Sequence, residues 1–134
     1  MSFVRTIGAA ISAVVLLGAT GPGLAGSTFE HVLGGAGAEG SLPPIDLEHE
    51  RRLHALALQL AASGLTTSAT AVDEGGLAVA LAQMCFAAAE GAAGCHVAVG
   101  DASPSQELFG ESHGRMLLEV EPAALNAVLA AAEA

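Results

Sequence analysis

The sequence contains no tryptophan, tyrosine or lysine, and aromatic residues make up only 3% of it. Because hydrophobic residues still reach 52%, the chain is not disordered overall, and any core must be packed mainly from alanine, leucine and valine. The four basic residues, all arginine, are outnumbered by 14 acidic ones, which gives a formal net charge of −10. Binding to nucleic-acid phosphates needs clustered cations, so nucleic acid is excluded as an expected partner.

Cysteine is also scarce, with Cys85 and Cys95 alone in 134 residues. Two residues are too few for a disulfide framework, and their spacing does not form a zinc-binding pattern. Cys95 is followed directly by His96, but this pair would need two further ligands, which the spacing of the other histidines does not supply. Reduced thiols in a cytosolic chain are therefore expected, without a bound metal.

A long uninterrupted hydrophobic run is absent as well. The apolar stretch Ile7–Leu17 is interrupted by glycine and is shorter than the roughly 20 residues of a membrane-spanning helix, so no membrane partner is expected. Arg5 ahead of this stretch and the small residues at Gly23–Ala25 imitate a secretory signal covering Met1–Ala25, which would mean export. The alternative is that Ala13–Leu17 forms a short buried strand that ends at glycine-rich turns.

Capping residues and hydrophobic periodicity predict helices and strands within one domain, since 134 residues suffice for one modest core. Ser27 and Glu30 match a capping box that begins a short helix ending near Leu33. Gly34–Pro44 and Asp101–Gln106 are expected loops. The remaining predicted elements are the strands Leu65–Val72, Cys95–Val99 and Met116–Val120, and a final helix from Pro122 with Leu125, Val128 and Leu129 on its inner side.

Asp46 is expected to cap the longest helix, which runs from Leu47 to Ser63 and stops at Gly64. Within it, His49 and His54 are five positions apart, whereas the zinc-protease motif requires a separation of four, so a metal site is excluded here. Both histidines and the two arginines between them are expected on a solvent-exposed face. The buried stripe is predicted to consist of Leu53, Leu56, Ala57 and Leu60.

One segment, Thr70–Met84, combines a turn, a pair of carboxylates and a helix start. Asp73 and Glu74 follow the strand, and the pair Gly75–Gly76 lets the backbone approach a ligand or another chain segment closely. A helix then begins at Leu77, so the glycine pair lies where free N–H groups favour an anion. The alternative is that the two glycines only make a tight strand-to-helix turn.

Three segments of the chain match a family pattern: Val14–Ser27, Asp73–Met84 with its start Asp-Glu-Gly-Gly-Leu, and Leu108–Arg115, which reads Leu-Phe-Gly-Glu-Ser-His-Gly-Arg. With these segments the chain resembles the synthase subunit of phosphoribosylformylglycinamidine synthase. The resemblance is to the C-terminal domain of the aminoimidazole ribonucleotide synthetase-like superfamily, and it assigns residues 13–134 to that domain and residues 1–12 to a non-matching segment. It implies an α/β (α+β-like) fold with a mixed sheet and helices mainly on one face, truncated at its C-terminal edge so that one sheet edge is open.

The resemblance implies a carbon–nitrogen ligase of purine biosynthesis that uses ATP, magnesium and glutamine-derived ammonia. Its reaction would convert formylglycinamide ribonucleotide into the formylglycinamidine product. The implied partners are the remaining synthase domains, a glutaminase subunit and a small accessory subunit, and the implied location is the cytoplasm. The nucleotide-binding domain that precedes this one in the family does not appear in the sequence, so the chain alone is expected to be inactive.

The resemblance also implies which residues bind the nucleotide. They are Asp73, Glu74, Gly75 and Gly76 at a phosphate-facing turn, with Ser112 and Arg115 as secondary contacts.

Two positions depart from the family pattern. Ala71 stands where the family has a magnesium-binding aspartate, and an alanine cannot ligate a metal. Asp73 stands where the family has a serine, so it is either a displaced metal ligand or merely a helix cap. For the later motif the alternative is a surface turn in which Glu111 and Arg115 pair loosely. Two other functions stay open: a small exported acidic protein, and a non-catalytic remnant that docks on a synthase partner.

Overall fold

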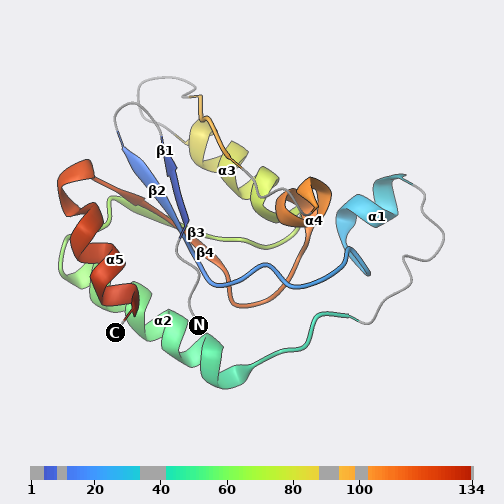
Figure 1. Ribbon diagram of the computed structural model, residues 1–134, viewed down its shortest axis with the longest axis horizontal. Coiled ribbons are helices and arrows are strands. Elements are labelled where there is room, and N and C mark those ends of the chain that lie inside the picture. Colours follow the sequence, from blue (N-terminus) through green and yellow to red (C-terminus); the bar gives the residue numbers. More distant parts are fainter. Residues whose placement is uncertain (1–4, 9–11, 34–41, 88–93, 99–102, 134) are drawn as a thin grey trace.

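A four-stranded antiparallel sheet forms the centre of the computed structural model, which describes residues 5–8, 12–33, 42–87, 94–98 and 103–133 (Figure 1). The strands are β1 (Arg5–Gly8), β2 (Ala13–Leu17), β3 (Ser68–Ala71) and β4 (Met116–Val120), in the order β1-β2-β4-β3. The α/β class and the strands at β2 and β4 are confirmed. All described strand pairs are antiparallel, which corrects the expectation of a mixed sheet. Hydrophobic periodicity carries no information about strand direction, so the sequence pattern could not specify it.

The two central strands, β2 and β4, hold the sheet together. They pair along their full length, from Ala13 opposite Val120 to Leu17 opposite Met116. All five residues of β2 are buried. A strand buried on both faces is a continuous apolar run rather than an alternating one, and β2 has such a run.

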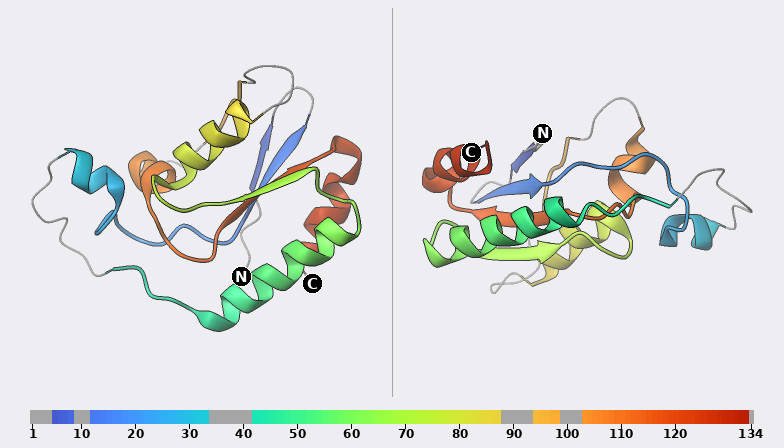
Figure 2. Two further views of the ribbon diagram at one scale, coloured as in Figure 1. Left: turned by 180° about the vertical axis from the view of Figure 1, so that it is seen from behind. Right: turned by 90° about the horizontal axis from the view of Figure 1, so that it is seen from below.

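Helices cover both faces of the sheet, which corrects the prediction that they lie mainly on one (Figure 2). On one face, α3 (Gly76–Phe86) packs Leu77 and Leu81 against Val14 and Leu16. The opposite face is covered by α2 (Leu47–Ala62) and α5 (Leu125–Glu133), whose buried residues include Leu53, Leu60 and Val128 and pack against Val15, Leu17, Leu118 and Val120. Successive β2 side chains point to opposite faces, so each face needs its own cover.

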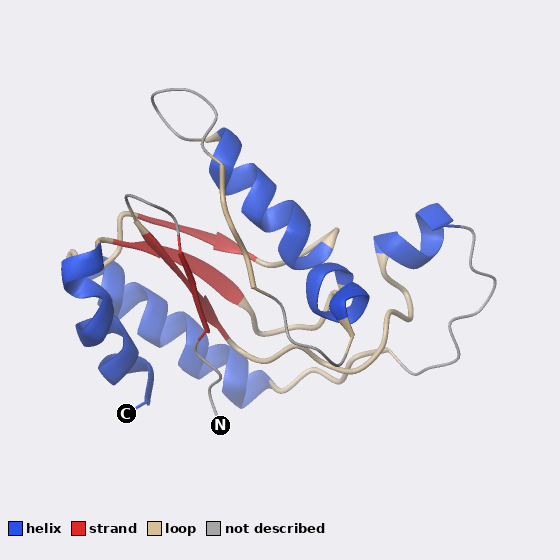
Figure 3. Cartoon of the chain, turned by 45° about the horizontal axis from the view of Figure 1, so that its top comes forward, coloured by secondary structure: helices blue, strands red, loops and turns tan. Residues whose placement is uncertain are grey.

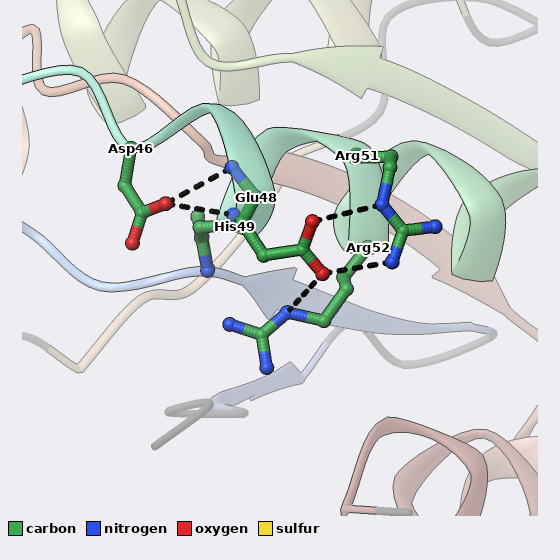
Figure 4. A network of polar contacts seen from close by, with 5 residues as sticks. All are labelled: Asp46, Glu48, His49, Arg51 and Arg52. Atoms are coloured by element: carbon green, nitrogen blue, oxygen red, sulfur yellow. Dashed lines mark hydrogen bonds and ion pairs between the residues drawn. The ribbon is translucent and has the colours of Figure 1, made fainter.

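The longest helix, α2, closely follows its prediction (Figure 4). The Asp46 side chain accepts hydrogen bonds from the N–H groups of Glu48 and His49, both at 3.0 Å, and therefore caps the helix as expected. His54 and the two arginines are exposed as predicted, and the arginines pair with Glu48 on the surface. His49 is the exception, because it is half-buried and its Nε2 lies 3.1 Å from the carbonyl oxygen of Gly114.

The shorter elements depart further from the sequence predictions. The predicted strand Leu65–Val72 shortens to β3. The segment from Gly94 to Ala98 is not a strand, so the strand predicted at Cys95–Val99 is wrong as far as the described residues reach. Pro104 begins the short helix α4 (Pro104–Phe109) where a loop was expected to extend to Gln106. The remaining elements are α1 (Thr28–Leu33) and a 3-10 turn, η1 (Pro122–Ala124), which leads into α5.

The N-terminal segment takes the second of its two predicted forms. Ala13–Leu17 is the buried strand β2, paired on one side with β1 and on the other with β4. Cleavage near Ala25 would remove a central strand, so the described fold requires this segment. Residues 34–41 of the expected loop at Gly34–Pro44 lie outside the described residues. In the part of the chain that is described, no helix combines the length and apolar character needed to cross a bilayer.

We expect that Leu118→Ala will lower the free energy of unfolding by about 2–5 kcal/mol, because the side chain is 1% exposed at the centre of β4 and its loss leaves a cavity. Leu58→Ala is the matched control, since Leu58 is 72% exposed on α2 and should change stability by no more than about 0.5 kcal/mol. Urea unfolding followed by circular dichroism measures both changes. Similar losses at the two positions would contradict this assignment of the core.

Candidate functional site

The segments Asp73–Met84 and Leu108–Arg115 meet where the start of α3 lies beside the end of α4 (Figure 3). Gly76, the first residue of α3, lies against the backbone of residues 108–110, and a Cβ atom there would come within 2.8 Å of the carbonyl oxygen of Gly110. Helix α1 joins the same place, since the rings of Phe29 and Phe109 stack with centroids 4.8 Å apart. Segments that are far apart in the sequence therefore form one junction.

The glycine pair makes the tight turn from β3 into α3. Gly75 and Gly76 have φ values of +83° and +68°, a backbone region in which other residues are strained. The N–H of Gly76 donates to the carbonyl oxygen of Asp73 at 2.8 Å and closes the turn. The predicted tight turn from strand to helix is thus confirmed, whereas a role of the two glycines in nucleotide binding stays a prediction.

Glu111 supplies the anion at this helix start. Its Oε1 accepts one hydrogen bond from the N–H of Gly75 at 2.8 Å and another from the N–H of Thr28 at 2.7 Å. Burial alone would raise the pKa of the Glu111 carboxyl, but the hydrogen bonds from Gly75 and Thr28, together with the Arg115 charge, outweigh it and leave the pKa lowered. One carboxylate oxygen therefore joins the start of α1 to the start of α3.

Arg115 is buried and fully engaged by the protein, so the alternative of a loose surface turn is wrong. It is 3% exposed and donates to the carbonyl oxygens of Ser112 and Gly110 and to the hydroxyl of Thr20. Burial lowers the pKa of Arg115, while the nearby Glu111 raises it in part. The guanidinium group holds the loop of residues 110–115 against the segment that follows β2.

Ser112 is likewise buried and hydrogen-bonded within the chain. It is 7% exposed, its hydroxyl accepts from the N–H of Gly21 at 3.0 Å, and it lies 3.5 Å from the carbonyl oxygen of Ala19, to which it can donate. Both residues that were predicted as secondary ligand contacts thus have their polar atoms engaged within the chain.

Part of the predicted site lines a groove of about 390 Å³ beside β3. Asp73, Ser112 and Arg115 line it, whereas Glu74, Gly75 and Gly76 do not. Asp73 and Glu74 are exposed, and both glycines are buried. The groove is also lined by charged and titratable side chains that the sequence did not mark as a site, namely Glu50, His54, Glu111 and His113.

The described residues do not fit a magnesium ion held by this chain alone. Magnesium needs several oxygen ligands, but Ala71 at the groove offers none, and the described part of the chain has no cluster of three or more His, Cys, Asp or Glu residues suited to a metal. The N–H groups of Gly75 and Gly76 already donate to Glu111 and Asp73. An added phosphate at this turn would have to displace the Glu111 carboxylate.

Glu111 was missed as a site residue for a definite reason. Its two donors lie 36 and 83 positions away in the sequence, so no local spacing marks the contact. Two signals were available: the expectation that the helix start at Gly75–Gly76 binds an anion, and the place of Glu111 within the motif Leu108–Arg115. Neither signal shows that the two segments meet.

Glu111→Gln should reduce stability at neutral pH by about 1–3 kcal/mol, because it replaces charge-assisted hydrogen bonds with weaker ones. A lowered pKa means that the contribution of Glu111 is complete above the ordinary pKa of glutamate and is lost as the pH falls through the lowered value. The variant should therefore show a flatter loss of stability on the acid side. Unfolding midpoints measured between neutral and acid pH test this slope.

Glu48→Gln is the control for that experiment. The pKa of Glu48 is also lowered, mainly by its hydrogen bond with Arg51, but this pair lies in solvent and should leave the midpoints nearly unchanged. If the two variants gave the same pH profile, Glu111 would not hold the junction.

Gly76→Ala should cost about 3 kcal/mol or more, since strain at positive φ adds to the clash of the new Cβ with residues 108–110. Gly64→Ala separates the two effects. Gly64 has a similar φ of +65° with nothing within 4 Å of the added atom, so it should cost only about 1–2 kcal/mol. Chemical denaturation measures the free energy of unfolding of both variants. Equal losses would mean that the backbone of residues 108–110 shifts at little cost to accommodate the new Cβ atom.

Comparison with known proteins assigns the chain to a family. The family model described as AIR synthase related protein, C-terminal domain, matches residues 12–134. The phosphoribosylformylglycinamidine synthase subunit PurL of Symbiobacterium thermophilum is 44% identical over 107 residues, which cover 78% of this chain and 14% of that protein. The PurL subunit of Moorella thermoacetica is 41% identical over 117 residues, covering 87% of this chain and 15% of its own length. The chain therefore spans about one seventh of these relatives and belongs to the AIR synthase related protein, C-terminal domain family.

Proposed function

We propose that this chain acts as a domain of a phosphoribosylformylglycinamidine synthase in purine biosynthesis. The observation that carries the proposal is the identity of 41–44% to PurL subunits over most of the chain. The junction of α1, α3 and α4 supports it, because the segments that resemble the family in sequence, Asp73–Met84 and Leu108–Arg115, are joined there through Gly75 and Glu111. The cytoplasm is the location that fits such an enzyme.

The proposed reaction is the ATP-dependent conversion of formylglycinamide ribonucleotide into the formylglycinamidine product. Phosphoryl transfer activates the amide oxygen, ammonia derived from glutamine attacks the amide carbon, and phosphate leaves. Such an enzyme supplies positioning rather than a nucleophile of its own. The chain's share is the turn and groove that carry Asp73, Glu74, Gly75, Gly76, Ser112 and Arg115.

The nucleotide and magnesium would be held chiefly by other domains of the synthase, with a glutaminase subunit and a small accessory subunit as further partners. Two observations support this division. Asp73 and Glu74 are exposed and can face another domain, whereas Ser112 and Arg115 are buried, with their polar atoms bonded within the chain, and would hold in place the loop that carries Glu111. The chain alone should therefore be inactive.

A non-catalytic remnant is a second candidate, favoured by one observation. Ala71, which lines the groove, has no ligand atom to offer where the family pattern has an aspartate. Such a remnant would keep the apolar sheet faces and the junction, and would dock on a synthase partner without contributing to nucleotide binding.

A domain exchange tests the proposal. In the PurL subunit of Symbiobacterium thermophilum, the matched segment is replaced by residues 12–134 of this chain, and the chimera is expressed in a bacterium that lacks its own PurL. If the proposal is right, the chimera supports growth without added purines. The purified chimera should form product with ammonia and ATP, whereas this chain by itself should form none.

Matched variants of the chimera separate the two candidates. Asp73→Asn should lower kcat/KM by about tenfold or more if this carboxylate faces the nucleotide, whereas Glu121→Gln, at an exposed position before η1, should not. The double change Ala71→Asp with Asp73→Ser restores the family pattern. Activity that appears only after this restoration would favour the remnant, and a folded chimera that stays inactive even then would refute the synthase role.

A further inference from the structure

Both cysteines of the chain face one cavity on the α3 side of the sheet. Cys85 lies in the last turn of α3 and Cys95 lies in the segment Gly94–Ala98, and both line a cavity of about 520 Å³ together with Val14, Leu81 and Met84. Both are free thiols, of which Cys85 is half-buried and Cys95 is exposed. This cavity is separate from the groove that carries the predicted nucleotide site.

Packing holds the segment that carries Cys95 against the core on the α3 side of the sheet. Val97, two residues after Cys95, is half-buried and packs against the core that α3 shares with β2 and β4. Burial raises the pKa of the Cys85 thiol, and the Cys95 thiol, which lines the same cavity, raises it further. The fold therefore brings both thiols to one cavity, although nine residues separate them in the sequence.

We propose that Cys85 and Cys95 form a reversible disulfide when the protein meets an oxidant of the peroxide class. The inference does not depend on the proposed synthase function, because it uses only the cysteine pair and the α3-side core. Oxidation would tie Gly94–Ala98 covalently to the C-terminal end of α3 at the wall of the cavity.

The chemistry proceeds in two balanced steps. The exposed thiol of Cys95, as thiolate, attacks hydrogen peroxide, the O–O bond breaks, and a sulfenic acid forms with release of one water once a proton is taken up. The Cys85 thiol then attacks the sulfenic sulfur, the S–S bond forms and a second water leaves. Overall, two thiols are oxidised and one peroxide is reduced to two waters. A dithiol reductant reverses the change by thiol–disulfide exchange.

The first test uses the full chain treated with one equivalent of hydrogen peroxide. The expected product is a monomer that has lost two hydrogen atoms, has no titratable thiol, and yields a linked peptide pair containing Cys85 and Cys95 on non-reducing mass analysis. In Cys85→Ala, the sulfenic acid on Cys95 should persist and be captured by dimedone. A product that is an intermolecular dimer, or that carries two separately oxidised cysteines, would overturn the proposal.

A second variant asks whether the fold, rather than the short loop, brings the thiols together. Cys95→Ser combined with His96→Cys moves the thiol by one position along an exposed segment and changes the loop by a single residue. In denaturant the two proteins should close their disulfides at equal rates. In the folded state the wild type should be at least about tenfold faster, because only it has an oriented pair. Equal rates in the folded state would refute the placement of the pair.

Discussion

The junction of α1, α3 and α4 depends on one oxygen atom, Oε1 of Glu111, which accepts hydrogen bonds from the N–H groups of Thr28 and Gly75. Two helices would otherwise begin with unsatisfied donors at a crowded, half-buried position. Arg115 lies close enough to lower the pKa of Glu111, and its own donors fix the loop that presents the carboxylate. Arg115 thus holds the loop in place, and the loop in turn positions the carboxylate of Glu111.

A second constraint comes from the shortage of aromatic side chains. A core built from alanine, leucine and valine gains little area per residue, so the chain buries its central strands on both faces. Leu117 and Leu118, neighbours in β4, contribute to opposite sides of the sheet and are both almost fully buried. The two layers of helices follow from this requirement, with α3 on one side and α2 and α5 on the other.

The sequence predicted those features that depend on residues close together in the chain. The Asp46 cap, the extent of α2 and the strands at β2 and β4 all have local signals, and each is confirmed. The strand β1 was not predicted, and the strand expected at Cys95–Val99 does not form in the residues described. An alternating pattern of a few residues does not specify a strand unless a partner offers hydrogen bonds.

Within the candidate site, the turn at Gly75–Gly76 could be predicted because glycine pairs mark positive φ. The burial of Ser112 and Arg115 could not, since it depends on Thr20 and Gly21, which lie more than ninety positions earlier in the chain. For the same reason the sequence predicted an exposed His49, whereas its Nε2 lies within hydrogen-bond distance of the carbonyl oxygen of Gly114. Contacts between distant segments decide these residues, and single-sequence patterns do not contain them.

The stacked rings of Phe29 and Phe109 give the molecule an optical reporter. No tryptophan or tyrosine absorbs over the fine structure of phenylalanine, and Phe86 is 76% exposed, where its ring is free to average its surroundings. Among the phenylalanines that the structure describes, the stacked pair that spans α1 and α4 should therefore give the strongest near-ultraviolet circular dichroism. Because α1 is held to the rest through Glu111, the docking of that helix can be followed by light alone, without a label.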